Sequence, residues 1–129
     1  MTMKINWLDR PLLFSPYIVL CLNQEEMEAA QKRLKVPANR RYDFPDSGAT
    51  TQVYEKEGSN NACIVCLSKE VQKSAHETQC SMVHEAVHVY QKAMEYMGET
   101  NPGEEIQAYC IERIFETLAI EYRRRRANS

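Results

Sequence analysis

Hydrophobic and polar positions along this chain predict strands first and long helices later. Residues 17–22 form a continuous apolar run, which is typical of a buried strand. Residues 50–55 and 62–68 are two further runs rich in β-forming residues, and the segment 57–61 between them has a good turn composition. These two runs therefore predict a β-hairpin. We expect residues 1–16 and 37–49 to form loops without regular secondary structure.

Three helices are predicted from the signals at their starts, where a capping residue is followed three residues later by an acid. These signals are Asn23 with Glu26, Ser74 with Glu77, and Asn101-Pro102 with Glu104. The first helix is expected to end near residue 35, before Val36-Pro37. The second is expected to end near residue 97, before Gly98, and the third to run from about Pro102 into the terminal arginines.

The second predicted helix carries two different faces at helical spacing. One face is apolar and consists of Cys80, Val83, Val87, Tyr90, Met94 and Met97. The other is polar and consists of Glu77, Ser81, His84, His88, Gln91 and Glu95. The predicted order of elements is β-α-β-β-α-α, so the expected fold class is α+β, with a short sheet and hairpin packed on this helix. A chain of 129 residues fits one domain spanning 1–129.

The net charge limits the classes of partner that we expect, and the cysteine content indicates the cellular compartment. The net charge of −2 gives no general attraction to nucleic acid or to an anionic membrane, so neither is expected as a partner. The arginines at 123–126 are expected to be a solvated helix end, with an anion-binding tail as the alternative. Five cysteines at irregular spacing do not form a disulfide framework, and the first residues lack a secretory pattern. We therefore expect a cytoplasmic protein with free thiols.

The segment His84-Glu85-Ala86-Val87-His88 carries the most specific chemistry in the sequence. Two histidines four residues apart on a helix point the same way and can bind one zinc ion. Glu85 then projects beside the metal, where it can take a proton from metal-activated water and pass it to a leaving amine. The uncharged residues around the motif suit a buried catalytic helix.

A zinc site with two histidines needs a third protein ligand and an open position for water. No histidine or aspartate follows His88, so the third ligand must be sought elsewhere in the C-terminal part of the chain. The candidates that remain are Glu95, Glu99, Glu104, Glu105, Cys110, Glu112 and Glu116. Glu95 lies two turns beyond His88 on the same helix and cannot return to the metal. Glu105, on the final helix, is the preferred ligand.

The motif, followed by Glu105-Ile106-Gln107-Ala108-Tyr109 on the next helix, resembles the gluzincin clan of zinc metallopeptidases. The similarity is greatest to its smallest members, the minigluzincin-like domains and the zincin-like domains encoded by phages and bacteria. It implies a glutamate as third ligand on a second helix, one Zn²⁺ per chain, and an edge strand that binds an extended peptide or protein substrate. Tyr109 differs from the aspartate that orients a ligand histidine in many gluzincins.

We therefore expect zinc-dependent hydrolysis of peptide bonds, with His84, His88 and Glu105 as metal ligands and Glu85 as general base and then acid. The alternative is a non-catalytic zinc-binding or protein-interaction module derived from a zincin, favoured by the short chain after the motif. A third interpretation is a metal-free α+β domain. Cys63 and Cys66 are expected to be buried on opposite faces of a strand. The sequence leaves the oligomeric state and the oxyanion donor open; Tyr54, Tyr96, Tyr109 and Tyr122 are the candidates for that donor.

Overall fold

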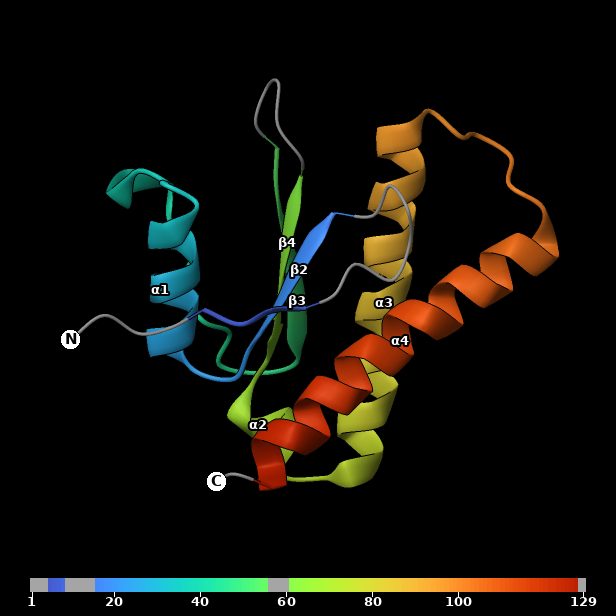
Figure 1. Ribbon diagram of the computed structural model, residues 1–129. Helices are drawn as coiled ribbons and strands as arrows, with labels where there is room; N and C mark the ends of the chain where they lie inside the picture. Colours follow the sequence, from blue (N-terminus) through green and yellow to red (C-terminus); the bar gives the residue numbers. More distant parts are fainter. Residues whose placement is uncertain (1–4, 9–15, 56–60, 128–129) are drawn as a thin grey trace.

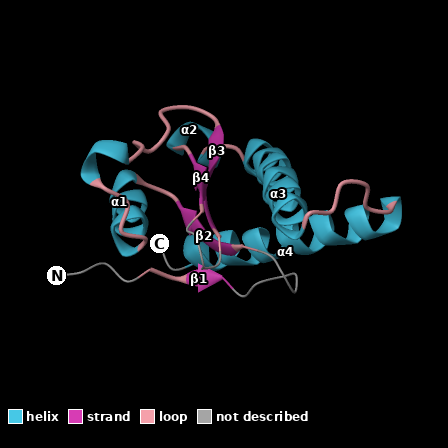
Figure 2. Ribbon diagram, turned by 90° about the horizontal axis from the view of Figure 1, so that it is seen from above, coloured by secondary structure: helices cyan, strands magenta, loops and turns pink. Residues whose placement is uncertain are grey.

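The computed structural model describes residues 5–8, 16–55 and 61–127, and they form a mixed four-stranded sheet with helices on both faces (Figures 1 and 2). The strands are β1 (Trp7–Leu8), β2 (Tyr17–Cys21), β3 (Ala49–Tyr54) and β4 (Ala62–Leu67). The helices are α1 (Gln24–Arg33), α2 (Lys69–Gln72), α3 (Ala75–Met97) and α4 (Glu104–Ala127), with a 3₁₀ turn at Ala38–Arg40.

The sheet has the strand order β1-β2-β4-β3, which makes β3 an edge strand. Strands β2 and β4 are parallel, with Tyr17 opposite Ala62, while β3 is antiparallel to β4. The predicted strand at 17–22 and the two arms of the predicted hairpin are thus confirmed, whereas the turn between the arms falls mainly outside the described residues. The predicted fold class, α+β, is also confirmed.

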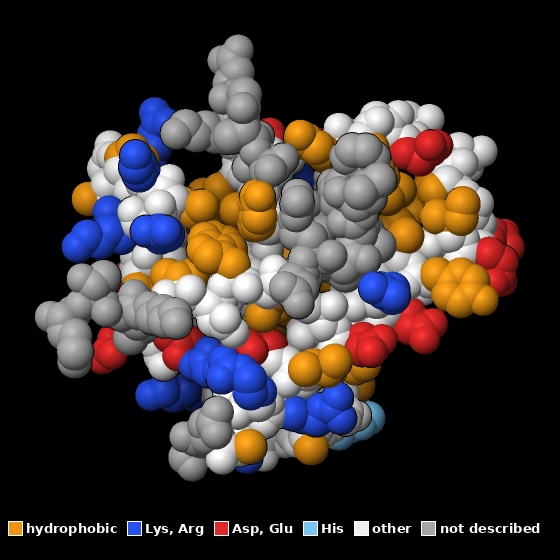
Figure 3. Space-filling view, in the orientation of Figure 1, with side chains coloured by type: hydrophobic (Ala, Val, Ile, Leu, Met, Phe, Trp, Pro, Cys, Tyr) orange, Lys and Arg blue, Asp and Glu red, His pale blue; other side chains and the backbone are white. Residues whose placement is uncertain are grey.

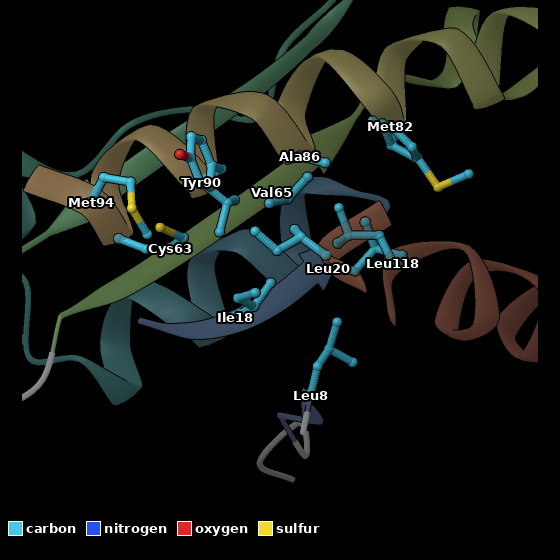
Figure 4. Packing of buried hydrophobic residues seen from close by; sticks show 14 of the residues in the cluster. Leu8, Ile18, Leu20, Cys63, Val65, Met82, Ala86, Tyr90, Met94 and Leu118 are labelled. Atoms are coloured by element: carbon cyan, nitrogen blue, oxygen red, sulfur yellow. The ribbon is translucent and has the colours of Figure 1, made fainter. Parts of the chain in front are cut away.

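Strand β4 is buried along its whole length because both faces of the sheet are covered. Its residues Cys63 and Val65 face α3 and α4, and Ile64 and Cys66 face α1. The sheet thus has one hydrophobic core on each face. Figure 4 shows the core on the face that α3 and α4 cover, in which Tyr90 and Ala86 of α3 lie over the sheet. The prediction that the two cysteines are buried on opposite faces is confirmed.

Two of the three predicted helix starts are capped by the side chains that the sequence indicates. The side chain of Asn23 accepts a hydrogen bond from the Glu26 backbone N–H at 2.9 Å, and Ser74 caps α3 in the same way. Helix α3 ends at Gly98, whose left-handed φ of 74° suits a residue without a Cβ. Helix α4 begins at Glu104, two residues later than predicted, so Asn101 does not cap it.

The structure adds elements that the sequence does not predict. Strand β1 lies within the segment expected to be irregular and pairs antiparallel with β2. Helix α2 is a single turn capped by Ser68. The chain between α1 and β3 is held by buried Gln31, whose amide bonds the backbone of Tyr42 in both directions, at 2.7 and 2.9 Å. This long-range contact carries no local sequence signal.

The predicted apolar face of α3 is confirmed at Tyr90 and Met94, which are buried, and is wrong at three of its other residues. Cys80, Val83 and Met97, which the spacing places on the apolar face, are exposed. The buried stripe instead passes through Met82, Ala86, Val89, Tyr90, Ala93 and Met94. Ala86 and Ala93 lie on this buried stripe, where their small side chains let the helix pack closely on the sheet.

Helix α4 packs across α3 and the sheet through a stripe that includes Ile114 and Leu118, both fully buried. Figure 3 shows acidic side chains over its first half and basic ones over its last turns. The terminal arginines are partly paired, as Arg124 bonds Glu121 at 2.8 Å and Arg125 bonds Glu26. None of the described helices combines the length and the apolar composition needed to cross a membrane.

Glu121 links the end of α4 to Asn6, the residue before β1, and gives a pH-dependent contribution to stability. It is 6 % exposed, accepts from Arg124 at 2.9 and 2.8 Å and from Asn6 at 3.0 Å, and the Arg124 hydrogen bonds lower its pKa. A lowered native pKa stabilises the fold above the unfolded pKa, and this is lost as the pH falls through the native pKa. We expect Glu121→Gln to lower the midpoint of urea unfolding at neutral pH.

The difference between Glu121→Gln and the wild type should shrink steadily as the pH falls below about 4, where the unfolded carboxyl is protonated. Glu116→Gln is the matched control, because Glu116 is exposed on the same helix. A Glu121→Gln effect that stayed the same size down to the acid transition would contradict the role of this carboxylate.

Candidate active site on helix α3

His84 and His88 lie one turn apart on α3, and their side chains converge outside the helix. Their Nε2 atoms are 3.1 Å apart, and both side chains are exposed. Two nitrogens bound to one zinc at the usual 2.0–2.1 Å and at a tetrahedral angle lie about 3.3 Å apart. The pair is therefore spaced as two ligands of one zinc ion would be.

Gln91 orients the second histidine of this pair. Its Oε1 lies 3.2 Å from Nδ1 of His88, which suits an Nδ1–H that donates to the amide oxygen. A proton on Nδ1 leaves the lone pair of Nε2 free for a metal, and it is the Nε2 atoms that converge. The sequence places Gln91 on the polar face without giving it a role. The spacing of three residues between His88 and Gln91 is the sequence signal from which this contact could be predicted.

Glu85 has a different environment from the two histidines. Its side chain is 3 % exposed, and its Oε1 accepts a hydrogen bond from Thr51 Oγ1 at 2.8 Å. Thr51 belongs to the edge strand β3, so this bond fixes the carboxylate between α3 and the sheet edge. Among the described residues, no donor bonds the second oxygen, Oε2, which is free to accept a proton from a bound molecule.

A pocket of about 320 Å³ opens where α3 meets the start of β3, and Ala49, Cys80, Ser81, His84 and Glu85 line it. Two larger hollows lie elsewhere, one of about 710 Å³ between β1 and the second half of α4, and one of about 790 Å³ between α1, α2 and the last turn of α4. Neither has a histidine or a cysteine in its lining. The smaller pocket brings a histidine, a cysteine and a buried carboxylate together in one lining, and we take it as the candidate site.

Glu105 lies away from the histidine pair. It is exposed in the first turn of α4, and it precedes the buried Ile114 by nine residues, or about 2.5 helical turns, which puts it on the opposite side of the helix. Figures 1 and 2 agree that the first turns of α4 project away from α3. Within residues 5–8, 16–55 and 61–127, no third histidine, cysteine, aspartate or glutamate joins the pair in a metal-binding group.

The chain has no match among protein-family models, curated proteins or solved structures. Its function is therefore argued from the site itself.

The tyrosines considered as oxyanion donors lie elsewhere. Tyr54 donates a hydrogen bond to Gln31 at 3.0 Å on the α1 side of the sheet. The partial burial of Tyr54 raises its pKa to about 12. Tyr96 and Tyr109 are largely exposed, and Tyr122 contacts Arg126. The oxyanion donor is thus not identified among these four residues.

Proposed function

We propose that this protein hydrolyses peptide bonds with a zinc ion held by His84 and His88, in the manner of a small gluzincin-like metallopeptidase. The observation that carries the proposal is that His84, whose Nε2 converges with that of His88, lines the same pocket as the buried Glu85. A histidine pair alone would support metal binding. The adjacent carboxylate, held by a second element, supports catalysis as well.

The donor set fits zinc in its chemistry and in the spacing of the pair. Imidazole nitrogens are common zinc ligands, and the 3.1 Å separation is close to the value that one tetrahedral ion requires. A bound zinc ion supplies a Lewis acid and lowers the pKa of a water molecule toward 7. The contact with Gln91 would hold His88 in the tautomer that binds metal.

Glu85 is the residue that moves protons in this proposal. Thr51 bonds one carboxylate oxygen and so restrains the carboxylate, and Oε2 remains to take a proton from the attacking water and deliver it to the leaving amine. Thr51 acts as a positioning residue because it touches Glu85 rather than the substrate. The low exposure of Glu85 limits competing contact with bulk water.

A peptide or protein is the substrate class that the surroundings favour. Ala49, the first residue of edge strand β3, lines the pocket next to His84 and Glu85. Strand β3 pairs with β4 on one side, and no strand among the described residues pairs with its other side. An extended peptide can add to such an edge through backbone hydrogen bonds, which would lay it across the pocket.

A non-catalytic zinc module is the second candidate, and the position of Glu105 favours it. The first turns of α4 are directed away from α3, and among the described residues no third donor joins the histidine pair. Such a site could bind zinc and still lack the closed ligand set of a catalyst. This candidate predicts a protein that retains zinc and cleaves nothing.

Incubation of the zinc-loaded protein with a broad peptide library, read by mass spectrometry, separates the two candidates. We expect new peptide termini that disappear after treatment with a zinc chelator and return when zinc is added. Zinc-loaded protein that leaves the library intact would overturn the catalytic proposal and support the module.

Glu105 remains the predicted third ligand, and this requires the first turns of α4 to approach α3 when zinc binds. These turns are exposed all round, so little packing opposes the movement. We expect Glu105→Gln to weaken zinc binding at least about 10-fold, measured by competition with a chromophoric chelator. Glu104→Gln is the matched control and should bind zinc normally. Equal affinity in both variants and the wild type would exclude Glu105 as a ligand.

A further inference from the structure

Helix α3 carries a row of four potential metal donors on one ridge. His76, Cys80, His84 and His88 follow one another at intervals of four residues, so each lies about one turn beyond the last. All four are exposed. The proposed catalytic site uses the last two, which leaves His76 and Cys80 without a function.

The first two donors of the row form a pair of their own. Sγ of Cys80 lies 3.7 Å from Nε2 of His76. A zinc ion with a Zn–S bond of about 2.3 Å, a Zn–N bond of about 2.0–2.1 Å and a tetrahedral angle separates its two donors by about 3.6 Å. We propose that His76 and Cys80 form a second metal site, which takes zinc or another thiophilic divalent cation.

This site is separate from the one at His84 and His88. The midpoints of the two pairs are eight residues apart on a straight helix, or about 12 Å along its axis, so one ion cannot serve both. With two protein ligands and otherwise water, the second site should bind more weakly than a site with three. It should fill when metal is added, and empty on dialysis.

Cys80 is suited to this role by its access to solvent. Cys21, Cys63 and Cys66 are buried and Cys110 is half-buried, so Cys80 is the cysteine that an ion in solution can reach. Burial also raises the pKa of the Cys63 thiol to about 12, which opposes formation of the thiolate that binds metal. Cys80 lines the same pocket as His84 and Glu85, so an ion held there would sit at the pocket wall.

The test is a titration of the reduced, metal-free protein with cadmium chloride, followed by the ultraviolet charge-transfer band of a cadmium thiolate. We expect the band in the wild type and its loss in Cys80→Ser, together with the loss of one bound equivalent. His76→Ala should shift the titration to higher cadmium. Cys110→Ser is the matched thiol control and should keep the band unchanged.

The double variant His84→Ala/His88→Ala distinguishes this site from the proposed catalytic one. It should lose the metal of that site and keep the cadmium thiolate band, so that either proposal can fail without the other. A band that persists in Cys80→Ser, is insensitive to His76→Ala, or vanishes with the histidine pair would overturn the second site. So would a wild type that shows no band at all.

Discussion

Replacing Glu85 with glutamine should lower the rate of peptide cleavage about 10²–10⁴-fold and leave zinc bound. Glutamine keeps the size of the side chain and an oxygen that can accept the hydrogen bond from Thr51, so the fold and the histidine pair should stay in place. It removes the carboxylate that takes the proton from water in the proposed mechanism. The effect should therefore fall on kcat, measured with a fluorogenic peptide selected from the library.

Glu95→Gln is the matched control for this prediction, because Glu95 is exposed on the same helix and bonds Lys92 at 3.2 Å. It should cleave at the wild-type rate. Metal content should be equal in the wild type and both variants. Cleavage by Glu85→Gln at the wild-type rate would rule out the carboxylate as base, whatever the zinc content.

Truncating Leu118 to alanine should lower the free energy of unfolding by about 2–5 kcal/mol, the usual range for a fully buried leucine. Leu118 is 0 % exposed and belongs to the buried cluster that joins α4 to α3 and the sheet, where Figure 4 places it near Leu20. The loss has two sources, the transfer of the removed methyl groups and the cavity that remains. Urea denaturation followed by circular dichroism measures it.

Ile120, two residues further on the same helix, supplies the control. It is 50 % exposed, so Ile120→Ala should change the free energy of unfolding by no more than about 0.5 kcal/mol. If the two substitutions had equal effects, the packing of α4 described above would be wrong. This comparison matters for function because α4 carries Glu105. The packing of α4 on α3 limits the positions that Glu105 can reach.

Local signals predict much of this fold because they act within a few residues. The caps at Asn23 and Ser74 and the left-handed residue Gly98 each fix one end of a helix through a contact that the sequence itself displays. The strands β2 and β4 follow from continuous apolar runs, since both of their faces are covered. These features need no knowledge of the rest of the molecule.

Features that depend on distant partners are the ones the sequence does not predict. Strand β1 forms because residues 7–8 pair with the edge of β2. The chain after α1 is held in place by the hydrogen bonds of Gln31 with the backbone of Tyr42. The buried face of α3 includes Met82, Ala86 and Val89 beside the predicted Tyr90 and Met94, so the hydrophobic spacing alone gives only part of that face. Each of these is a tertiary effect that local propensity does not contain.

The candidate site shows the same division. The convergence of His84 and His88 follows from a spacing of four residues on a helix, and the structure places their Nε2 atoms together. The contact of Glu85 with Thr51 joins residues 34 positions apart, and it becomes visible only once β3 lies beside α3. The prediction of Glu105 as a ligand rests on elimination and resemblance, neither of which fixes the direction of α4.

Zinc content is the most direct test of the central claim, that His84 and His88 hold the metal of this site. The wild type and the single variants His84→Ala and His88→Ala should be dialysed against a weak chelator and analysed by mass spectrometry for bound metal. The account predicts about one zinc per chain in the wild type and loss of that zinc in both variants, with unchanged helix content. A wild type without zinc, or variants that keep it, would contradict the account.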